Sequence, residues 1–272
     1  MLDGAEKWRQ GNHPMSSILP ATLPWRVAAV LTLGCLAGSL AILPQMLTLA
    51  ATADPSLTEG LPPWPLLLLV TALQSLVVFG LAATAGLAMA QRLRHGPDLL
   101  MAWLYGRPAP DAWARLRDGL ALGLASGIVL GLVQGLLVQP LMPPGLSGPT
   151  APLWMRLLGG MLYGGIAEEV LLRLLVVSGL VLLLQRLTGR RPSPRVWWSA
   201  ILVAAVLFGV LHLPVVAAMG PLTPPLAAAV TMVNASMGLV FGWLYWWRGL
   251  EAAMLAHAAA HLPLQLIVGM VA

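Results

Sequence analysis

The chain has 272 residues, of which 58 % are hydrophobic and only 9 % are charged. Soluble domains carry about 25 % charged residues, so a soluble fold of this composition would expose too much apolar surface. The net charge of +5 does not indicate nucleic acid as a partner, because the arginines lie between apolar runs rather than on one basic face. A single cysteine, Cys35, excludes an intrachain disulfide and a cysteine metal cluster. The composition predicts an all-α, polytopic bundle of transmembrane helices in contact with the lipid bilayer.

Seven apolar stretches are long enough to cross a bilayer, which takes about 20 apolar residues in a helix. Clusters of Pro and Gly separate them, as in residues 61–65 and 140–145, and such clusters mark turns. The predicted spans are residues 25–50, 64–90, 118–140, 154–187, 196–217, 224–247 and 250–271.

The distribution of Lys and Arg between these spans indicates their orientation. The alternate loops, 51–63, 141–153 and 218–223, contain neither residue type, whereas every other connection carries arginine. Because cytoplasmic loops carry the excess of Lys and Arg, the N-terminus is predicted inside and the C-terminus outside. The predicted cytoplasmic set is Lys7, Arg9, Arg26, Arg92, Arg94, Arg107, Arg115, Arg117, Arg186, Arg190, Arg191, Arg195 and Arg248.

Aromatic residues beside these arginines are predicted to form belts at the membrane surface. They are Trp197 and Trp198 near Arg195, and Trp243, Tyr245, Trp246 and Trp247 near Arg248. Trp and Tyr are enriched at the level of the lipid head groups, which makes a belt a better interpretation than a substrate-binding cage.

The N-terminal half is predicted to be a scaffold. Residues 1–23 are polar and are predicted to form a cytoplasmic tail, and residues 24–149 a transmembrane scaffold. The loop 91–117 places Trp and Leu among basic residues, which predicts an amphipathic helix on the membrane surface, with a solvated connector as the alternative. Ladders of small residues favour close helix packing. The ladders are Gly80, Ala83 and Gly86 in one span and Gly123, Gly127 and Gly131 in the next.

The fourth span carries charges that an apolar run should not carry. Glu168, Glu169 and Arg173 lie near its middle, and each charge costs roughly 2.5–3.5 kcal/mol to insert into a bilayer. Such groups are usually paired and line a polar cavity, so the cluster predicts a functional site. Arg173 follows Glu169 by one helical turn and can hold that carboxylate ionised while leaving its neighbour to act.

Three histidines provide partners for these charges. His212 lies in the fifth span, and His257 and His261 lie four residues apart on one face of the seventh. Together with the carboxylates they suit hydrolysis, because a desolvated carboxylate can take a proton from water and imidazole N–H groups can stabilise an oxyanion. Structural hydrogen bonding between helices, or the proton relay of a transporter or channel, are the alternatives.

Three motifs in order resemble the CPBP family of intramembrane proteases, which includes CAAX prenyl proteases of the Rce1 type and bacterial Abi proteins. They are Glu168-Glu169-xxx-Arg173, Phe208-xxx-His212 and His257-xxx-His261. The resemblance implies that residues 150–272 form the catalytic transmembrane core. It further implies an endopeptidase of a bacterial plasma membrane that acts on a membrane-associated or lipidated peptide or protein. Zinc, aspartyl and serine proteases of membranes fit badly, because their motifs are absent from the apolar spans.

The resemblance also implies a role for each site residue. Glu168 and His212 would activate the attacking water, and Glu169 and Arg173 would support the site. His257 and His261 would stabilise the oxyanion, with His261 in place of the family's usual Asn. We expect no cofactor; the alternative is Zn²⁺ bound by His212, His257, His261 and Glu168. An inactive relative acting as an immunity factor or scaffold is a further alternative.

One geometric condition must be met for these residues to share a site. At about 1.5 Å per residue, His257 lies about 10 Å and His212 about 24 Å from the cytoplasmic ends of their helices. Helix tilt, the length of the fourth span or a break near Pro214 must bring them together.

Overall fold

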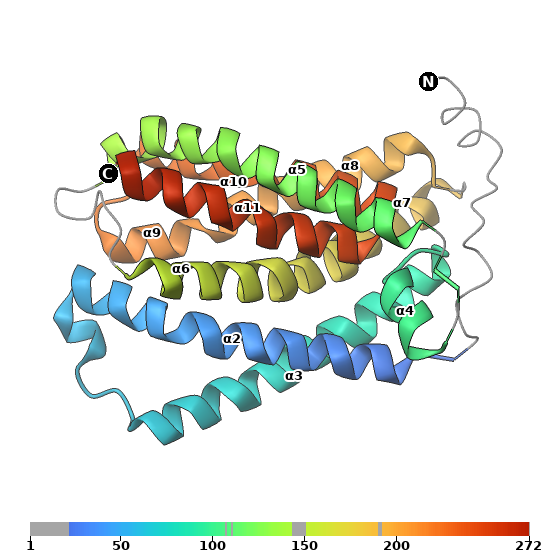
Figure 1. Ribbon diagram of the computed structural model, residues 1–272, viewed down its shortest axis with the longest axis horizontal. Helices are drawn as coiled ribbons and strands as arrows, with labels where there is room; N and C mark the ends of the chain where they lie inside the picture. The colour runs from blue at the N-terminus through green and yellow to red at the C-terminus, as the bar shows by residue number, and fades with distance from the viewer. Residues whose placement is uncertain (1–21, 107, 110, 143–150, 190–191, 272) are drawn as a thin grey trace.

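The computed structural model describes residues 22–106, 108–109, 111–142, 151–189 and 192–271. Every regular element within these ranges is helical, which confirms the predicted fold class. Most of the predicted tail, residues 1–23, lies outside the described residues. Within the described residues, seven helices are long and apolar enough to span a membrane, so the protein is an integral membrane helix bundle (Figure 1). They are Trp25–Ala53, Trp64–Arg92, Ala112–Leu141, Leu153–Thr188, Pro194–Met219, Pro224–Arg248 and Leu250–Met270.

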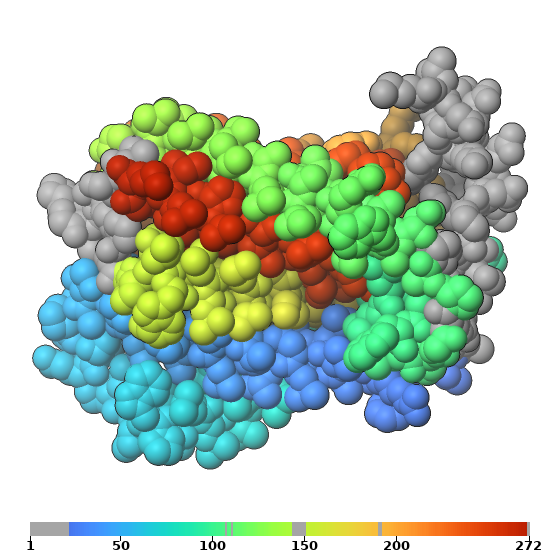
Figure 2. Space-filling view, in the orientation of Figure 1, coloured from blue at the N-terminus to red at the C-terminus, as the bar shows by residue number. Residues whose placement is uncertain are grey.

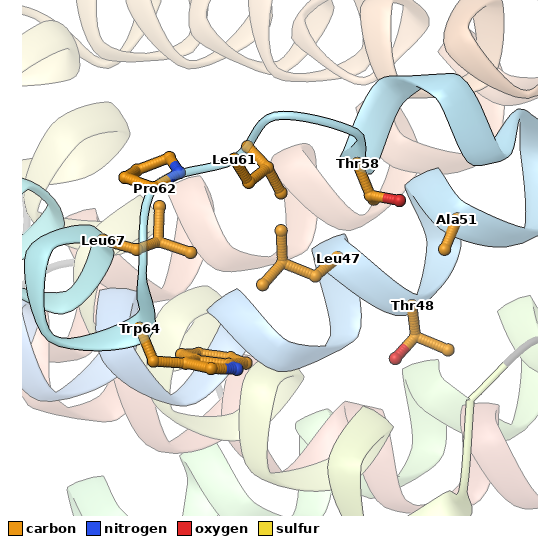
Figure 3. A pocket seen from close by; sticks show the side chains of 8 residues that line it. All are labelled: Leu47, Thr48, Ala51, Thr58, Leu61, Pro62, Trp64 and Leu67. Carbon is orange, nitrogen blue, oxygen red and sulfur yellow. The ribbon is translucent and has the colours of Figure 1, made fainter.

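The first two spans, α2 (Trp25–Ala53) and α3 (Trp64–Arg92), form one side of the bundle and are joined through the 3₁₀ turn η1 (Pro55–Thr58). They diverge toward this connection (Figure 1). A cavity of about 330 Å³ lies between them there (Figure 3). Its wall is mainly apolar and contains none of the predicted site residues. The lining residues are Leu47, Thr48, Ala51, Thr58, Leu61, Pro62, Trp64 and Leu67.

The third span packs along the last helix, α11 (Leu250–Val271). It consists of α5 (Ala112–Val133), the π-helical turn η2 (Gln134–Val138) and the 3₁₀ turn η3 (Gln139–Leu141). Gly123 and Gly127 are buried where a Cβ atom would overlap the backbone oxygens of Ala256 and Ala260. The glycine ladder therefore lets the two backbones approach closely, as predicted from its spacing.

The fourth span is one continuous helical run whose middle is π-helical. It comprises α6 (Leu153–Gly159), η4 (Gly160–Glu168), η5 (Val170–Val177) and α7 (Ser178–Thr188). It contacts α2 and α3 on one side and α11 on the other (Figures 1 and 2). A π-helix has hydrogen bonds from residue i to i+5 and is frequently found at functional sites. The charged residues thus lie in the centre of the molecule, on its least regular helix.

The fifth and sixth spans pack against each other and complete the core. α8 (Pro194–Leu211) ends just before His212, and α9 (Leu213–Met219) continues after it with Pro214 in its first turn. The break expected near Pro214 is therefore confirmed. The antiparallel helix α10 (Pro224–Arg248) approaches α8 closely, because Gly238 lies against Ala205.

The predicted amphipathic helix of loop 91–117 forms only over α4 (Asp98–Leu104), and α5 begins at Ala112 rather than at residue 118. Met101 packs into the core, whereas Trp103 is 75 % exposed. Asp98 is buried 3.5 Å from Arg115, and this burial raises the pKa of Asp98 to about 6 although Arg115 opposes the shift. The buried Arg115 thus connects α4 to α5.

The belt prediction is wrong for Trp197 and Tyr245, which are buried. The His95 ring nitrogen Nε2 donates to the Tyr245 carbonyl at 2.7 Å, and the Tyr245 hydroxyl is hydrogen-bonded to the Ser178 hydroxyl at 2.7 Å. The His95 ring also packs edge-on against Trp197. The segment that follows α3 therefore covers these aromatic side chains, which adjacency to arginine in the sequence cannot indicate.

Replacing Gly123 by Ala tests the close approach of α5 and α11. The new Cβ would overlap the Ala256 carbonyl, and overpacking of this kind costs about 1–3 kcal/mol of unfolding free energy. We expect a lower melting temperature in detergent. Gly80→Ala is the matched control, because its nearest neighbour, the Thr32 side chain, is 3.8 Å away. Equal melting temperatures for both variants would contradict this packing.

Candidate active site

The two adjacent glutamates have different environments. The Glu169 side chain is fully buried, whereas 20 % of the Glu168 side chain is exposed. They stand at the junction of η4 and η5, so successive side chains point in different directions around the helix. One carboxylate is thereby enclosed in protein while its neighbour is accessible to a reactant.

Glu169 is neutralised mainly by Arg173, one helical turn later. The guanidinium Nη1 lies 3.0 Å from Glu169 Oε1, and Nη2 donates to the Gly238 carbonyl at 3.2 Å. The guanidinium also lies over the rings of Phe208 and Phe241, at 5.1 and 5.6 Å from their centroids. Arg173 is 2 % exposed, and the pair, the carbonyl and the two aromatic faces replace part of the water that the charges lose. Glu169 Oε2 remains buried without a hydrogen-bond partner among the described residues.

His257 connects the two glutamates. Its Nδ1 is 2.7 Å from Glu169 Oε1, and its Nε2 is 3.6 Å from Glu168 Oε2. In its ion pair with Arg173, Glu169 is an acceptor only, so Nδ1 carries a proton and donates it. The ring is stacked between Phe241 and His261, with centroids 4.5 and 5.3 Å away. Hydrogen bond and stacking together fix the direction in which Nε2 points.

His261 lies one turn beyond His257, and their rings are almost parallel, with an interplanar angle of 11°. Both Nε2 atoms lie 2.9 Å from the position that a Cβ on Gly164 would take, so they are near enough to contact one shared atom. A Cβ on Gly160 would overlap the His261 ring. The His261 Nδ1 is buried without a hydrogen-bond partner among the described residues. Gly160 and Gly164 therefore provide the space that the two imidazoles occupy.

His212 lies in the turn between α8 and α9. Its Nδ1 donates to the Phe208 carbonyl at 2.8 Å, because a carbonyl oxygen can only accept. In the neutral ring Nε2 is then left as an acceptor, which is the form that a base requires. The His212 side chain is half-buried.

The Phe208 ring lies between His212 and His257. Its centroid is 4.7 Å from the His212 centroid and 5.9 Å from the His257 centroid. The two imidazoles are therefore no further apart than the sum of these distances, despite their different predicted depths. The break after α8 and the long fourth span bring them to one region. The structure thus gathers all six predicted residues: Glu168, Glu169, Arg173, His212, His257 and His261.

The alternative zinc set consists of His212, His257, His261 and Glu168. A tetrahedral zinc needs ligand atoms at about 2.0–2.2 Å from one point. No group of three or more His, Cys, Asp or Glu residues gathers closely enough for this in the part of the chain that the structure describes.

Several residues that shape the site were not predicted from the sequence. Gly160 and Gly164 accommodate the imidazoles, and Phe241 stacks on His257. The signal was present for the glycines, because residues 160, 164 and 168 follow one another at helical spacing. The role of Phe241 depends on which face of α10 meets α11, and no motif indicates it.

Comparisons with known proteins identify the segment that contains the site. Residues 150–262 match the family model described as Rce1-like, type II CAAX prenyl endopeptidase Rce1-like. This range contains all six residues gathered in the structure. No curated protein and no solved structure matches the chain.

Replacing Gly164 by Ala tests whether the imidazoles need the space that the absence of a side chain at this position leaves. The new Cβ would lie 2.9 Å from both Nε2 atoms, so we expect the His257 ring to shift and its hydrogen bond to Glu169 to lengthen. The measurement is the downfield imidazole N–H proton signal in NMR spectra of protein labelled at histidine. Gly179→Ala, which faces the flexible Met89 sulfur at 3.3 Å, is the control. An unshifted signal in Gly164→Ala would contradict this geometry.

Proposed function

We propose that the protein is an intramembrane endopeptidase of the plasma membrane and a member of the CPBP/CAAX protease family, whose Rce1-like model matches residues 150–262. Its substrate is a membrane-associated or lipidated peptide or protein. The observation that carries the proposal is the contrast between two neighbouring carboxylates. Glu169 is enclosed by Arg173 and His257, and Glu168 is partly exposed beside His257.

In this mechanism Glu168 and His212 activate water. A water molecule between the Glu168 carboxylate and His212 Nε2 gives up a proton to Glu168, and its oxygen attacks the carbonyl carbon of the scissile peptide. General-base assistance of this kind contributes roughly 10²–10⁴-fold to a rate. The proton then passes from Glu168 to the departing amine nitrogen as the C–N bond breaks. The acceptor state of His212 Nε2, set by the bond from Nδ1 to Phe208, supports its part in this step.

His257 and His261 stabilise the oxyanion of the tetrahedral intermediate. Their Nε2 atoms converge beside Gly164, which supports joint contact with one oxygen. For His257 to donate from Nε2 it must carry protons on both nitrogens, because Nδ1 already donates to Glu169. The two flanking glutamates are the groups that balance this charge. His261 donates from a single N–H, as an amide would in its place.

Glu169 and Arg173 position the other groups without touching the substrate. Glu169 accepts from His257 Nδ1 and so orients the imidazole, as the carboxylate of a His–carboxylate pair does in other hydrolases. Arg173 holds Glu169 and reaches α10 through the Gly238 carbonyl. The pair therefore links three of the helices around the site.

The family match favours a protease over the transporter and the inactive scaffold. A transporter would use the Glu and His residues as a proton relay, and an inactive relative would bind partners without cleaving them. Both alternatives differ from the proposed protease in the same way, because neither a transporter nor an inactive relative releases peptide products. The metal-free mechanism is also part of the proposal. It uses only proton donors and acceptors of this chain.

Replacing Glu168 by Gln tests the base, and replacing His212 by Ala tests its partner. We expect either variant to cleave a membrane-reconstituted peptide library at least 10²-fold more slowly than wild type. The rate is measured by mass spectrometry of the products, with and without a chelator. Glu59→Gln, an exposed carboxylate in the α2–α3 connection, is the control.

Equal cleavage rates for wild type and both variants would contradict the assignment of Glu168 as the base and His212 as its partner. A wild-type rate that disappears with chelator and returns with added Zn²⁺ would instead overturn the metal-free mechanism. No cleavage by any preparation, with melting temperatures unchanged, would favour an inactive relative or a transporter.

Replacing Glu169 by Gln separates the positioning role from the catalytic one. Arg173 would remain buried without its counter-charge, and breaking a buried ion pair costs about 3–5 kcal/mol. We therefore expect Glu169→Gln to lower both the melting temperature and the cleavage rate, whereas Glu168→Gln lowers only the rate. If Glu168→Gln destabilised the protein as much as Glu169→Gln, the two glutamates would not have the different roles proposed.

A further inference from the structure

A second cavity lies at the other end of the bundle from η1, where α3 and α7 end side by side. It has a volume of about 330 Å³ and is lined by Arg92, Leu182, Gln185, Arg186 and Gly189. It contains none of the six site residues. We propose that this cavity binds the phosphate group of an anionic phospholipid from the leaflet at the predicted cytoplasmic side.

The charge of the cavity is positive. Arg92 and Arg186 are exposed, and neither forms an ion pair with a carboxylate in the described parts of the chain. Each arginine belongs to the last turn of its helix. A helix C-terminus carries roughly half a negative charge, so two guanidinium groups exceed what two helix ends neutralise. The excess attracts an anion.

Gln185 is a third polar residue that lines the cavity. Its Oε1 is buried and has no hydrogen-bond partner among the described residues. The oxygen and nitrogen of an amide are assigned from their partners, and the reversed amide places its NH₂ group at this position. Phosphate oxygens only accept hydrogen bonds, so an NH₂ donor and two guanidinium groups suit them.

The surroundings of the cavity favour a lipid over a free phosphate ion. Leu182 forms part of the wall, and the neighbouring α7 residues Leu183 and Leu187 are 50 % and 74 % exposed. Acyl chains can cover these side chains while the head group reaches the arginines. Basic pockets between transmembrane helices on the cytoplasmic side are suited to anionic head groups. The ammonium group of a zwitterionic lipid would instead meet two positive charges.

A lipid in this position would hold α3 against the helix that carries the glutamates. α7 continues η5 without interruption. α3 contacts the η5 and α7 parts of this helix, with Gly86 against Leu174 and Gly179 near the Met89 sulfur. The proposed lipid site therefore adds a contact at the open end of this helix pair, independently of the reaction at Glu168.

The test uses the full chain in detergent, with dioleoylphosphatidylglycerol, dioleoylphosphatidylcholine or inorganic phosphate added separately. Native mass spectrometry counts the retained lipid, and the melting temperature reports stabilisation. We expect phosphatidylglycerol to be retained in preference to phosphatidylcholine. Arg92→Gln and Arg186→Gln should each weaken its apparent affinity about fivefold. Arg195→Gln, an exposed arginine outside the cavity, should leave the affinity unchanged.

Leu182→Trp fills the cavity without changing the charge and should also reduce phosphatidylglycerol retention. Unchanged retention in Arg92→Gln, Arg186→Gln and Leu182→Trp would overturn the proposal. Equal retention of both lipids would overturn it as well. Stabilisation by inorganic phosphate equal to that by phosphatidylglycerol would show a soluble anion site in place of a lipid site. Cleavage of peptides is not part of this test, so its outcome is independent of the proposed protease activity.

Discussion

The buried cluster of Glu169, Arg173 and His257 is the interaction on which the rest of this structure depends. A charge inside a bilayer protein is tolerated only when other groups replace its hydration. Here one carboxylate oxygen lies 3.0 Å from a guanidinium nitrogen and 2.7 Å from an imidazole nitrogen. The guanidinium is further satisfied by a backbone carbonyl and two aromatic faces. These partners come from four helical segments, so the charges are neutralised only when these segments pack together in the core.

Small residues provide the space that this packing requires. Bulky imidazole and guanidinium groups enter a crowded bundle only where the facing helix lacks side chains. Gly160 and Gly164 lie under the two histidines of α11, and Gly123 and Gly127 let α5 approach the opposite side of the same helix. Helix α11 is thus held closely from both sides. This arrangement leaves His257 with a fixed orientation, which is what a positioned imidazole requires.

The sequence predicted the fold class, the seven spans and the six residues that meet at the site, because charges within apolar runs and their helical spacing are local signals. The sequence did not predict how site residues at different distances from their helix ends come together. His212 and His257 differ in their distance from the ends of their helices, and the turn before Pro214, the long fourth span and the packing around Phe208 bring them together. Tyr245 and Trp197 were placed at the membrane surface because neighbouring arginines mark the interface, but tertiary contacts with His95 bury both. The π-helical middle of the fourth span has no sequence pattern of its own.

Adjacent carboxylates on one helix cannot both face the same partner, since successive side chains point in different directions. That constraint gives the Glu-Glu pair two environments without any further element. Glu169 turns toward Arg173 and His257 and is sealed, so it is suited to orient the imidazole. The Glu168 side chain is 20 % exposed and lies 3.6 Å from the far nitrogen of the same ring. The His257 imidazole lies between two unlike carboxylates and couples them. A proton taken up at Glu168 changes the charge beside Nε2 of this ring, whose Nδ1 is already hydrogen-bonded to Glu169. The chemistry proposed for the site follows from this division between a sealed carboxylate and an open one.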